Sequence, residues 1–187
     1  MRWDSETALL VMDVQNGIVE RYADDHEDYL PRVERTVETA HDAGIPVFFV
    51  VVRFRDGYPE IDPRNETFSR ITDDEGETSM TEGSAATEPA ITPDDDDLVV
   101  GKKRVSAFAG SDLEMILRAQ GITHLVLSGI ATSGVVLSTL RYAADRDYEL
   151  TVLEDCCLDS DPEVHRVLTE KVFSRQATVT TSEDWTP

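Results

Sequence analysis

The sequence has very little lysine and a large excess of acids. Lys102, Lys103 and Lys171 are the only lysines among 17 basic residues, whereas 38 residues are acidic, which gives a net charge of −21 at pH 7. A surface of this charge repels nucleic acid and anionic lipid, so we expect neither as a partner. The acids are spread along the whole chain, which favours adaptation to high salt. An acidic patch that binds a partner protein is the alternative.

The chain also lacks any run of about eighteen apolar residues, so we expect no membrane-spanning helix. Its start contains Asp4 and Glu6 and no basic segment ahead of an apolar one, which argues against a secretory signal. The two cysteines, Cys156 and Cys157, are adjacent, and neighbouring cysteines rarely form a disulfide because the ring is strained. These features predict a cytoplasmic protein.

Continuous apolar runs alternate with segments of helical periodicity. We expect the runs to be strands buried on both faces of a parallel sheet: Ala8–Asp13, Pro46–Arg53, Leu98–Val100, His124–Ser128, Leu150–Leu153 and Ala177–Thr180. The expected helices are Leu30–Ala43, Ser111–Gln120, Ser133–Asp147 and Pro162–Arg175. Ser111 with Glu114 fits a capping box, and Asp161 fits a cap before Pro162.

This alternation predicts one domain over residues 1–187 with an α/β fold. We expect a three-layer α/β/α architecture around a doubly wound six-stranded parallel sheet of order 3-2-1-4-5-6. The exception is a segment of about residues 54–97, which is rich in glycine and proline and has no clear core period. Long segments of this kind are usually functional or disordered. We expect a lid or substrate loop over the carboxyl ends of the strands, with a loose acidic insertion as the alternative.

Three segments contain residue types suited to chemistry. Asp13 ends the first strand, at the edge of the sheet where ligands bind in this architecture. Partial desolvation there raises the pKa of a carboxyl group and suits proton transfer, although Asp13 could instead cap a helix or a turn with Asn16 and Gly17. Lys102 and Lys103 stand together in a chain that otherwise avoids lysine. A pairing with the acids at 94–97 is the alternative for Lys103.

The third segment follows the fourth strand and opens a helix. Gly129 and Gly134 permit tight turns there, and the helix start offers backbone N–H groups to an anion. In the predicted sheet order, Asp13 meets this loop at the switch point between the first and fourth strands. Lys102 lies two strands away from Asp13, roughly 9–10 Å at normal strand spacing, so its side chain must lean inward to reach Asp13.

The order and spacing of three motifs resemble the isochorismatase-like hydrolases, a family that includes nicotinamidases and N-carbamoyl-amidohydrolases. They are DVQNG from Asp13, K-x-x-x-S-A-F from Lys102, and G-I-A-T from Gly129 followed by V-L-S-T. The similarity runs from about residue 8 to residue 179. It implies that Asp13 and Lys102 are catalytic, and it places the family's nucleophilic cysteine at Val135.

Valine cannot attack a carbonyl, so the resemblance implies the route of family members that lack this cysteine. In those enzymes the aspartate acts as an acid and water attacks the substrate. We therefore expect a cofactor-independent hydrolase of a small, carboxylate-bearing molecule. Two alternatives are a catalytically silent relative that binds a metabolite or a partner, and an amidase whose thiol comes from Cys156 or Cys157. Thr132 and Ser133 have no obvious histidine base beside them, which argues against a hydroxyl nucleophile.

The remaining expectations concern substrate contacts, metals and assembly. Arg53, Arg55 and Arg104 could hold a substrate carboxylate through a bidentate fork. The full set expected to contact substrate is Gln15, Phe54, Arg55, Arg104, Phe108, Ala131, Ser133, Gly134 and Val135. The four histidines lack metal-ligand spacing, so we expect no metal and no cofactor. The resemblance and the apolar end of the helix after Ser133 predict a homodimer or homotetramer.

Overall fold

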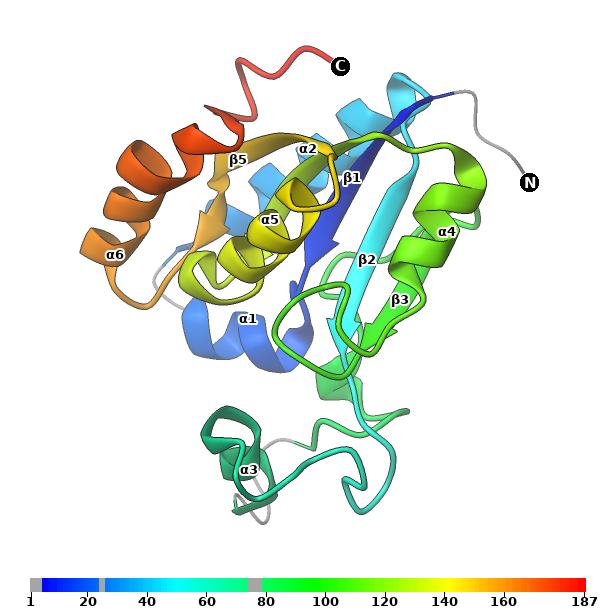
Figure 1. The fold of residues 1–187 in the computed structure, drawn as a ribbon, viewed down its shortest axis with the longest axis vertical. Coiled ribbons are helices and arrows are strands. Elements are labelled where there is room, and N and C mark those ends of the chain that lie inside the picture. The colour runs from blue at the N-terminus through cyan, green and yellow to red at the C-terminus, as the bar shows by residue number, and fades with distance from the viewer. Residues whose placement is uncertain (1–4, 24–25, 74–78) are drawn as a thin grey trace.

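The computed structural model describes residues 5–23, 26–73 and 79–187 (Figure 1). Six parallel strands form one sheet in the order β3-β2-β1-β4-β5-β6, as the sequence predicts. Their bounds are β1 Thr7–Met12, β2 Val47–Val52, β3 Leu98–Lys102, β4 His124–Ile130, β5 Glu149–Leu158 and β6 Thr178–Thr180. All six strands overlap the predicted runs.

Helices cover both faces of the sheet and complete the predicted three layers. Packed against one face are α1 (Asn16–Tyr22) and α2 (Tyr29–Asp42). The other face is covered by α4 (Leu113–Gln120), α5 (Leu137–Ala144) and the segment after α6 (Pro162–Val167). A π-helical turn, Thr132–Val136, leads into α5, and the turns Leu168–Val172 and Phe173–Arg175 follow α6. No helix among the described residues is long and apolar enough to cross a membrane.

The central strand β1 shows why its sequence is apolar throughout. Ala8, Leu10 and Met12 pack into the core on the α4–α5 side, whereas Leu9 and Val11 pack into the core on the α2 side. Successive side chains of a strand point to opposite faces, so a strand covered on both faces buries every one of them. Burying a side chain such as Leu or Val contributes about 1.5–3 kcal/mol, which makes β1 a strong anchor for the residue that follows it.

Two short helices were not predicted. The seven-residue α1 has no buried residue and no side-chain cap, so nothing in its local pattern separates it from a turn. The eight-residue α3, Glu66–Asp73, lies inside the glycine- and proline-rich segment. Helices this short are marginal alone and depend on tertiary packing. The end of the first strand leads into α1, whose N-cap residue is Gln15 and not Asp13.

One helix start and one strand differ from the prediction in detail, and a second helix start agrees with it. α4 begins after Asp112, so the predicted capping box is wrong: Ser111 Oγ donates to the Ala107 carbonyl, and Glu114 binds side chains on α4 and α5. Asp161 caps α6 as predicted, because its carboxylate accepts two backbone N–H groups. β5 extends to Leu158, so both cysteines lie within this strand rather than after it.

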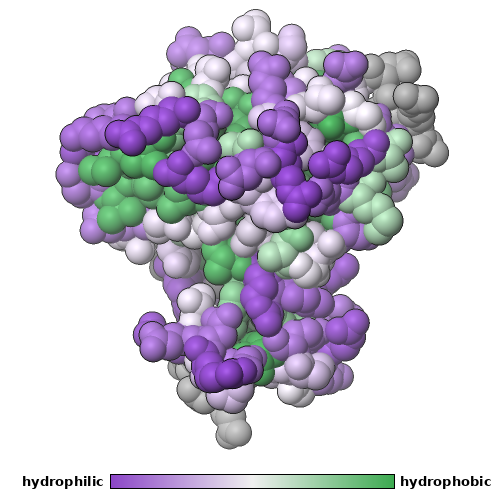
Figure 2. Space-filling model, in the orientation of Figure 1, coloured by the Kyte–Doolittle hydropathy of each residue, from purple (hydrophilic) through white to green (hydrophobic). Residues whose placement is uncertain are grey.

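The segment at 54–97 has structure of its own. Figure 1 shows α3 beyond the carboxyl ends of the strands, set apart from the main body. Phe54, Phe68 and Met80 form a small apolar cluster with Val52 at the end of β2, and Phe54 packs edge-on against Phe68 with centroids 5.7 Å apart. Figure 2 shows hydrophilic side chains over much of the outer surface of this part. The segment thus adds an apolar wall beyond the sheet edge.

Candidate active site

A cavity of about 530 Å³ lies at the carboxyl ends of the central strands. This volume falls within the usual range for small-molecule pockets. Elements from the sheet edge, from α1 and from α3 enclose the cavity together. The lining residues are Asp13, Gly17, Ile18, Arg21, Tyr22, Val52, Glu66, Thr67, Phe68, Arg70, Ile71, Met80, Lys102, Val105, Ile130, Ala131, Gly134 and Val135.

Asp13 lies on the floor of this cavity, directly after β1. Its backbone has a φ of 56°, a left-handed conformation that few residue types other than glycine adopt and that aspartate tolerates better than most. The Asp13 N–H donates to the Val50 carbonyl at 2.8 Å, which fixes this residue against β2. Such strained residues cluster at functional sites, because the surrounding structure must hold them in place.

Lys102 reaches Asp13 across the end of β2. The register pairs Lys102 with Val52 of β2, and its Nζ lies 2.9 Å from Asp13 Oδ2. The same ammonium group donates to the carbonyls of Arg104 at 2.9 Å and Val105 at 3.1 Å. A lysine has three N–H donors, so all three are occupied. Lys102 is 1% exposed. It therefore holds Asp13 in place and has no N–H donor left for a substrate.

The second carboxylate oxygen of Asp13 is different. Oδ1 is buried and has no hydrogen-bond partner among the described residues, and a buried polar atom without a partner is costly. Burial raises the pKa of Asp13 above its usual value, and the nearby Lys102 charge partly offsets that rise. One oxygen is thus anchored to a cation, and the other is available to give or take a proton in a partly dry cavity.

β4 approaches β1 closely beside this pair. Gly129 has a φ of 137°, and a Cβ at this position would lie 2.0 Å from the Met12 carbonyl oxygen, so only glycine fits. Ala131, Gly134 and Val135 continue from β4 into the π-helical turn and line the cavity. The structure therefore brings Asp13, Lys102 and Val135 to one cavity, as the motif order implies. The catalytic roles of the first two stay a prediction.

Two other residues expected to contact substrate support the cavity from outside. Gln15 is fully buried, and its amide bridges both the N–H and the carbonyl of Val52 and the carbonyl of Thr87. It joins the end of β2 to the segment at 54–97. Phe54 is also fully buried, in the cluster behind Phe68. Neither residue lines the cavity. Each instead contacts residues of the cavity wall from behind.

The predicted arginines do not line the cavity either. Arg55 is paired with Glu60 at 2.6 Å, and Arg104 donates to the carbonyls of Lys103 and Glu60. The Arg53 side chain lies against Gly101 of β3. Arg55 and Arg104 thus bind local acceptors.

Phe108 and Ser133 likewise lie elsewhere. Phe108 belongs to the core and stacks on Tyr142 of α5, with ring centroids 4.7 Å apart. Ser133 is exposed, and its N–H donates to Asp159 Oδ2 at 2.7 Å. Lys103 donates to the Arg53 carbonyl and pairs with Glu82 at 3.2 Å. The acids at 94 and 97 pair instead with His41.

Arg21 and Arg70 line the cavity and were missed by the sequence analysis. They come from α1 and α3, the two helices that were not predicted. A weak signal was present, because Ile18 and Tyr22 are four residues apart and Phe68 and Ile71 are three apart, the spacings of one helix face. Which arginine faces a pocket depends on the tertiary position of its helix, and that information is absent from the local pattern.

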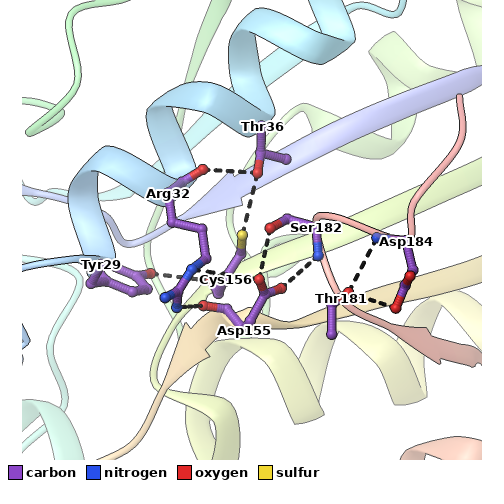
Figure 3. A network of polar contacts seen from close by, with 8 residues as sticks. All are labelled: Tyr29, Arg32, Thr36, Asp155, Cys156, Thr181, Ser182 and Asp184. Carbon is purple, nitrogen blue, oxygen red and sulfur yellow. Dashed lines mark hydrogen bonds and ion pairs between the residues drawn. The ribbon is translucent and has the colours of Figure 1, made fainter.

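Neither cysteine lies on the cavity. Cys156 and Cys157 are buried in the cores on opposite faces of the sheet. Burial raises the pKa of Cys156 to about 11 and that of Cys157 well above its usual value, so neither thiol ionises readily near neutral pH. Cys156 Sγ lies 3.4 Å from Thr36 Oγ1, within the network of α2, β5 and the C-terminal segment shown in Figure 3.

A histidine does lie beside Thr132, contrary to the expectation from sequence. His165 Nδ1 is 2.8 Å from Thr132 Oγ1, but the hydroxyl also donates to the Leu158 carbonyl at 3.1 Å. A hydroxyl has one proton to donate, and Thr132 donates it to that carbonyl. Thr132 Oγ1 therefore accepts a hydrogen bond from His165 Nδ1. The pair ties the π-helical turn to β5 and α6, and Thr132 is not a lining residue.

The described residues contain no group of three or more His, Cys, Asp or Glu side chains that could hold a metal ion. The carboxylate and ammonium of the floor are already paired with each other. What this arrangement offers chemically is a buried carboxyl oxygen next to a fixed positive charge. The absence of a metal and of a cofactor stays a prediction.

Comparisons of this chain with known proteins agree on one protein family. Residues 7–184 match the isochorismatase domain. The ureidoacrylate amidohydrolase RutB of Methylobacterium radiotolerans is 36% identical over 86% of this chain and 70% of its own. A protein of Arabidopsis thaliana named a probable inactive nicotinamidase is 32% identical over 88% of this chain and 86% of its own. The crystal structure of N-carbamoylsarcosine amidase from Thermoplasma acidophilum superposes with a TM-score of 0.78, at 30% identity and with all of both chains covered. The chain therefore belongs to the isochorismatase family of hydrolases.

Proposed function

We propose that this protein is a cofactor-independent hydrolase of a small, carboxylate-bearing molecule, and that it works through Asp13 and water rather than through a thiol. The observation that carries the proposal is the state of Asp13. One carboxylate oxygen is fixed by Lys102 at 2.9 Å, and the other is buried, unpartnered among the described residues, and part of a residue that lines a cavity.

In the proposed reaction, water attacks the substrate carbon and the bond to the leaving group breaks. Asp13 delivers a proton from Oδ1 to the departing atom, and the attacking water then returns a proton to Asp13. The raised pKa of Asp13 favours the protonated form that this step needs. Lys102 stabilises the carboxylate after the proton has left, because its charge lies beside Oδ2. It is thus a positioning residue.

The identity of residue 135, a valine, supports a route that uses no thiol. Val135 lines the cavity with an apolar side chain at the position where the resemblance places the family's cysteine. The buried cysteines of β5 do not line that cavity, and their raised pKa values keep them as inert thiols. We further propose that residues 1–187 act as one domain whose segment at 54–97 shapes the substrate pocket through Phe68, Ile71 and Met80.

The test is turnover on a panel of vinyl ethers, amides and carbamoyl compounds, with three proteins compared. The wild type should hydrolyse at least one class. Asp13→Asn should lose turnover by about 10²-fold or more, the usual contribution of a positioned acid or base, with its circular dichroism unchanged. Asp62→Asn is the matched control, because Asp62 is exposed and its one ion pair among the described residues is with Arg64. Full activity in Asp13→Asn would refute the proposed role.

A second candidate is a silent relative that binds a metabolite without converting it. Two observations favour it: Val135 on the cavity wall, and the likeness to a plant protein named probably inactive. This candidate predicts saturable binding of a panel compound with no turnover by the wild type. Turnover that depends on Asp13 would exclude it.

A further inference from the structure

The cavity is unusually basic for this chain. Five of its described lining residues carry a charge, namely Asp13, Lys102, Arg21, Arg70 and Glu66. Three of the five are basic, although acids outnumber bases by 38 to 17 in the whole sequence. Asp13 and Lys102 are paired with each other on the floor. The other charged lining groups are the guanidinium groups of Arg21 and Arg70 and the carboxylate of Glu66.

The residues that line the cavity differ in exposure, so a buried floor can be distinguished from an exposed rim. Asp13, Lys102 and Val135 are buried, whereas Arg21 and Arg70 are exposed although they line the same cavity. The two arginines lie on different helices, α1 and α3, so they face the cavity from separate elements. No hydrogen bond or ion pair joins either guanidinium to another residue that the structure describes. Glu66 lies one helical turn before Arg70, yet the two form no ion pair within 4.0 Å.

The wall between floor and rim is apolar. Ile18, Val52, Phe68, Ile71 and Met80 line it. A ligand whose reacting bond lies at Asp13 must therefore pass an apolar section before it reaches the arginines. Such a lining suits a molecule with an apolar middle and an anionic end.

We propose that Arg21 and Arg70 form an anion-binding subsite at the rim and that they select substrates with a terminal carboxylate. The inference rests on the proposed function only for the position of the reacting bond. Guanidinium groups match carboxylates in geometry and remain charged at every physiological pH. In this proposal the subsite takes the place of Arg53, Arg55 and Arg104, none of which lines the cavity, as the source of charge selection. The negative charge of Glu66, which lines the same cavity, lowers the affinity of the two arginines for an anion.

The experiment compares two probes that differ only in terminal charge, N-carbamoyl-β-alanine and N-carbamoyl-β-alaninamide. Their dissociation constants are measured by calorimetry at low salt, and the ratio of the two constants gives the carboxylate preference. Wild type should prefer the carboxylate. Arg21→Gln and Arg70→Gln should each reduce the preference by about three- to fivefold, as expected for a partly exposed ion pair. Glu66→Gln should increase it, and added salt should reduce it in the wild type.

Arg35→Gln is the matched control, because Arg35 is an exposed arginine on α2 outside the cavity and its loss changes the net charge equally. Its preference should equal that of the wild type. Equal affinity of the wild type for both probes, or no measurable binding of the carboxylate, would overturn the subsite. An equal loss in the Arg35 variant would show a general field effect and would overturn it too. Arginine-dependent preference without hydrolysis would leave the subsite standing and count against the hydrolase proposal.

Discussion

At the scale of single residues, the two oxygens of Asp13 have different surroundings. Oδ2 faces Lys102 at 2.9 Å, and Oδ1 has no partner among the described residues. The carbonyls of Arg104 and Val105 hold the ammonium group in place, so the carboxylate cannot rotate freely. This asymmetry gives a carboxyl group with one anchored and one reactive atom, and it gives the lysine a role that does not require contact with substrate.

The pH dependence follows from the sign of the Asp13 shift. Burial raises the pKa of Asp13, and Lys102 lowers it by a smaller amount. Because the proposed step uses the protonated acid, kcat/KM should be highest below this pKa and should fall as the pH rises through it. Lys102→Gln removes the lowering effect, so the falling limb should move to higher pH. A pH–rate profile measures this shift.

Lys103→Gln serves as the control for that profile, since Lys103 pairs with Glu82 outside the cavity. Its falling limb should stay where the wild type has it. A wild-type rate that rises with pH, or a limb that Lys102→Gln leaves unmoved, would contradict the acid role of Asp13.

A substitution at Val135 tests what this position can support. Val135→Cys replaces an apolar cavity wall with a thiol close to the Asp13–Lys102 pair, at a small cost in packing. We expect iodoacetamide to alkylate this new thiol at neutral pH far faster than the native cysteines, whose pKa values burial raises. Mass spectrometry after a timed reaction gives the modified position. Modification of Cys156 or Cys157 at the same rate would show that the native thiols are not inert.

At the scale of elements, a network of polar contacts among α2, β5 and the C-terminal segment holds that segment, residues 181–187, in place (Figure 3). Asp155 of β5 accepts from the N–H and the hydroxyl of Ser182, both at 2.7 Å, and lies 3.5 Å from Arg32 Nε. Trp185 packs into the α2-side core just beyond. These contacts hold a chain end that has no helix or strand of its own after β6.

Asp155→Ala should therefore lower the free energy of unfolding by about 1–3 kcal/mol, the range for removing one partner of a partly buried polar group. Denaturant unfolding followed by tryptophan fluorescence measures this change. Asp184→Ala is the control, because Asp184 is exposed and, among the described residues, its side chain bonds to Thr181 alone. This substitution should cost much less. Equal effects of the two substitutions would mean that the network contributes nothing specific.

The elements also show what could be predicted from the sequence. β1 and β2 were found because every side chain after Thr7 in β1 and every side chain of β2 is buried, which gives unbroken apolar runs. α1 and α3 were missed because short helices depend on packing rather than on local pattern. Most of the floor of the cavity could be predicted, since Asp13 ends such a run, the rarity of lysine pointed to Lys102 and Lys103, and the family resemblance selected Lys102 of the two. The rim could not, because Arg21 and Arg70 belong to the two missed helices.

At the scale of the whole molecule, a net charge of −21 stores repulsion that salt can relieve. The melting temperature should rise from low salt to molar sodium chloride. Chloride is the salt to use, because sulfate would stabilise the fold by exclusion from the surface. A flat or falling melting temperature would contradict adaptation to high salt and would favour a partner for the acidic surface. The expected homodimer or homotetramer stays a prediction.

Hydrolysis by this protein should need no thiol, and the double variant Cys156→Ala with Cys157→Ala decides the question. Turnover is measured on a substrate of the wild type, with circular dichroism confirming that the variant folds. We expect turnover within about twofold of the wild type, because both thiols are buried in the cores and neither lines the cavity. Loss of turnover in a folded double variant would refute the thiol-independent route and assign the nucleophile to a cysteine.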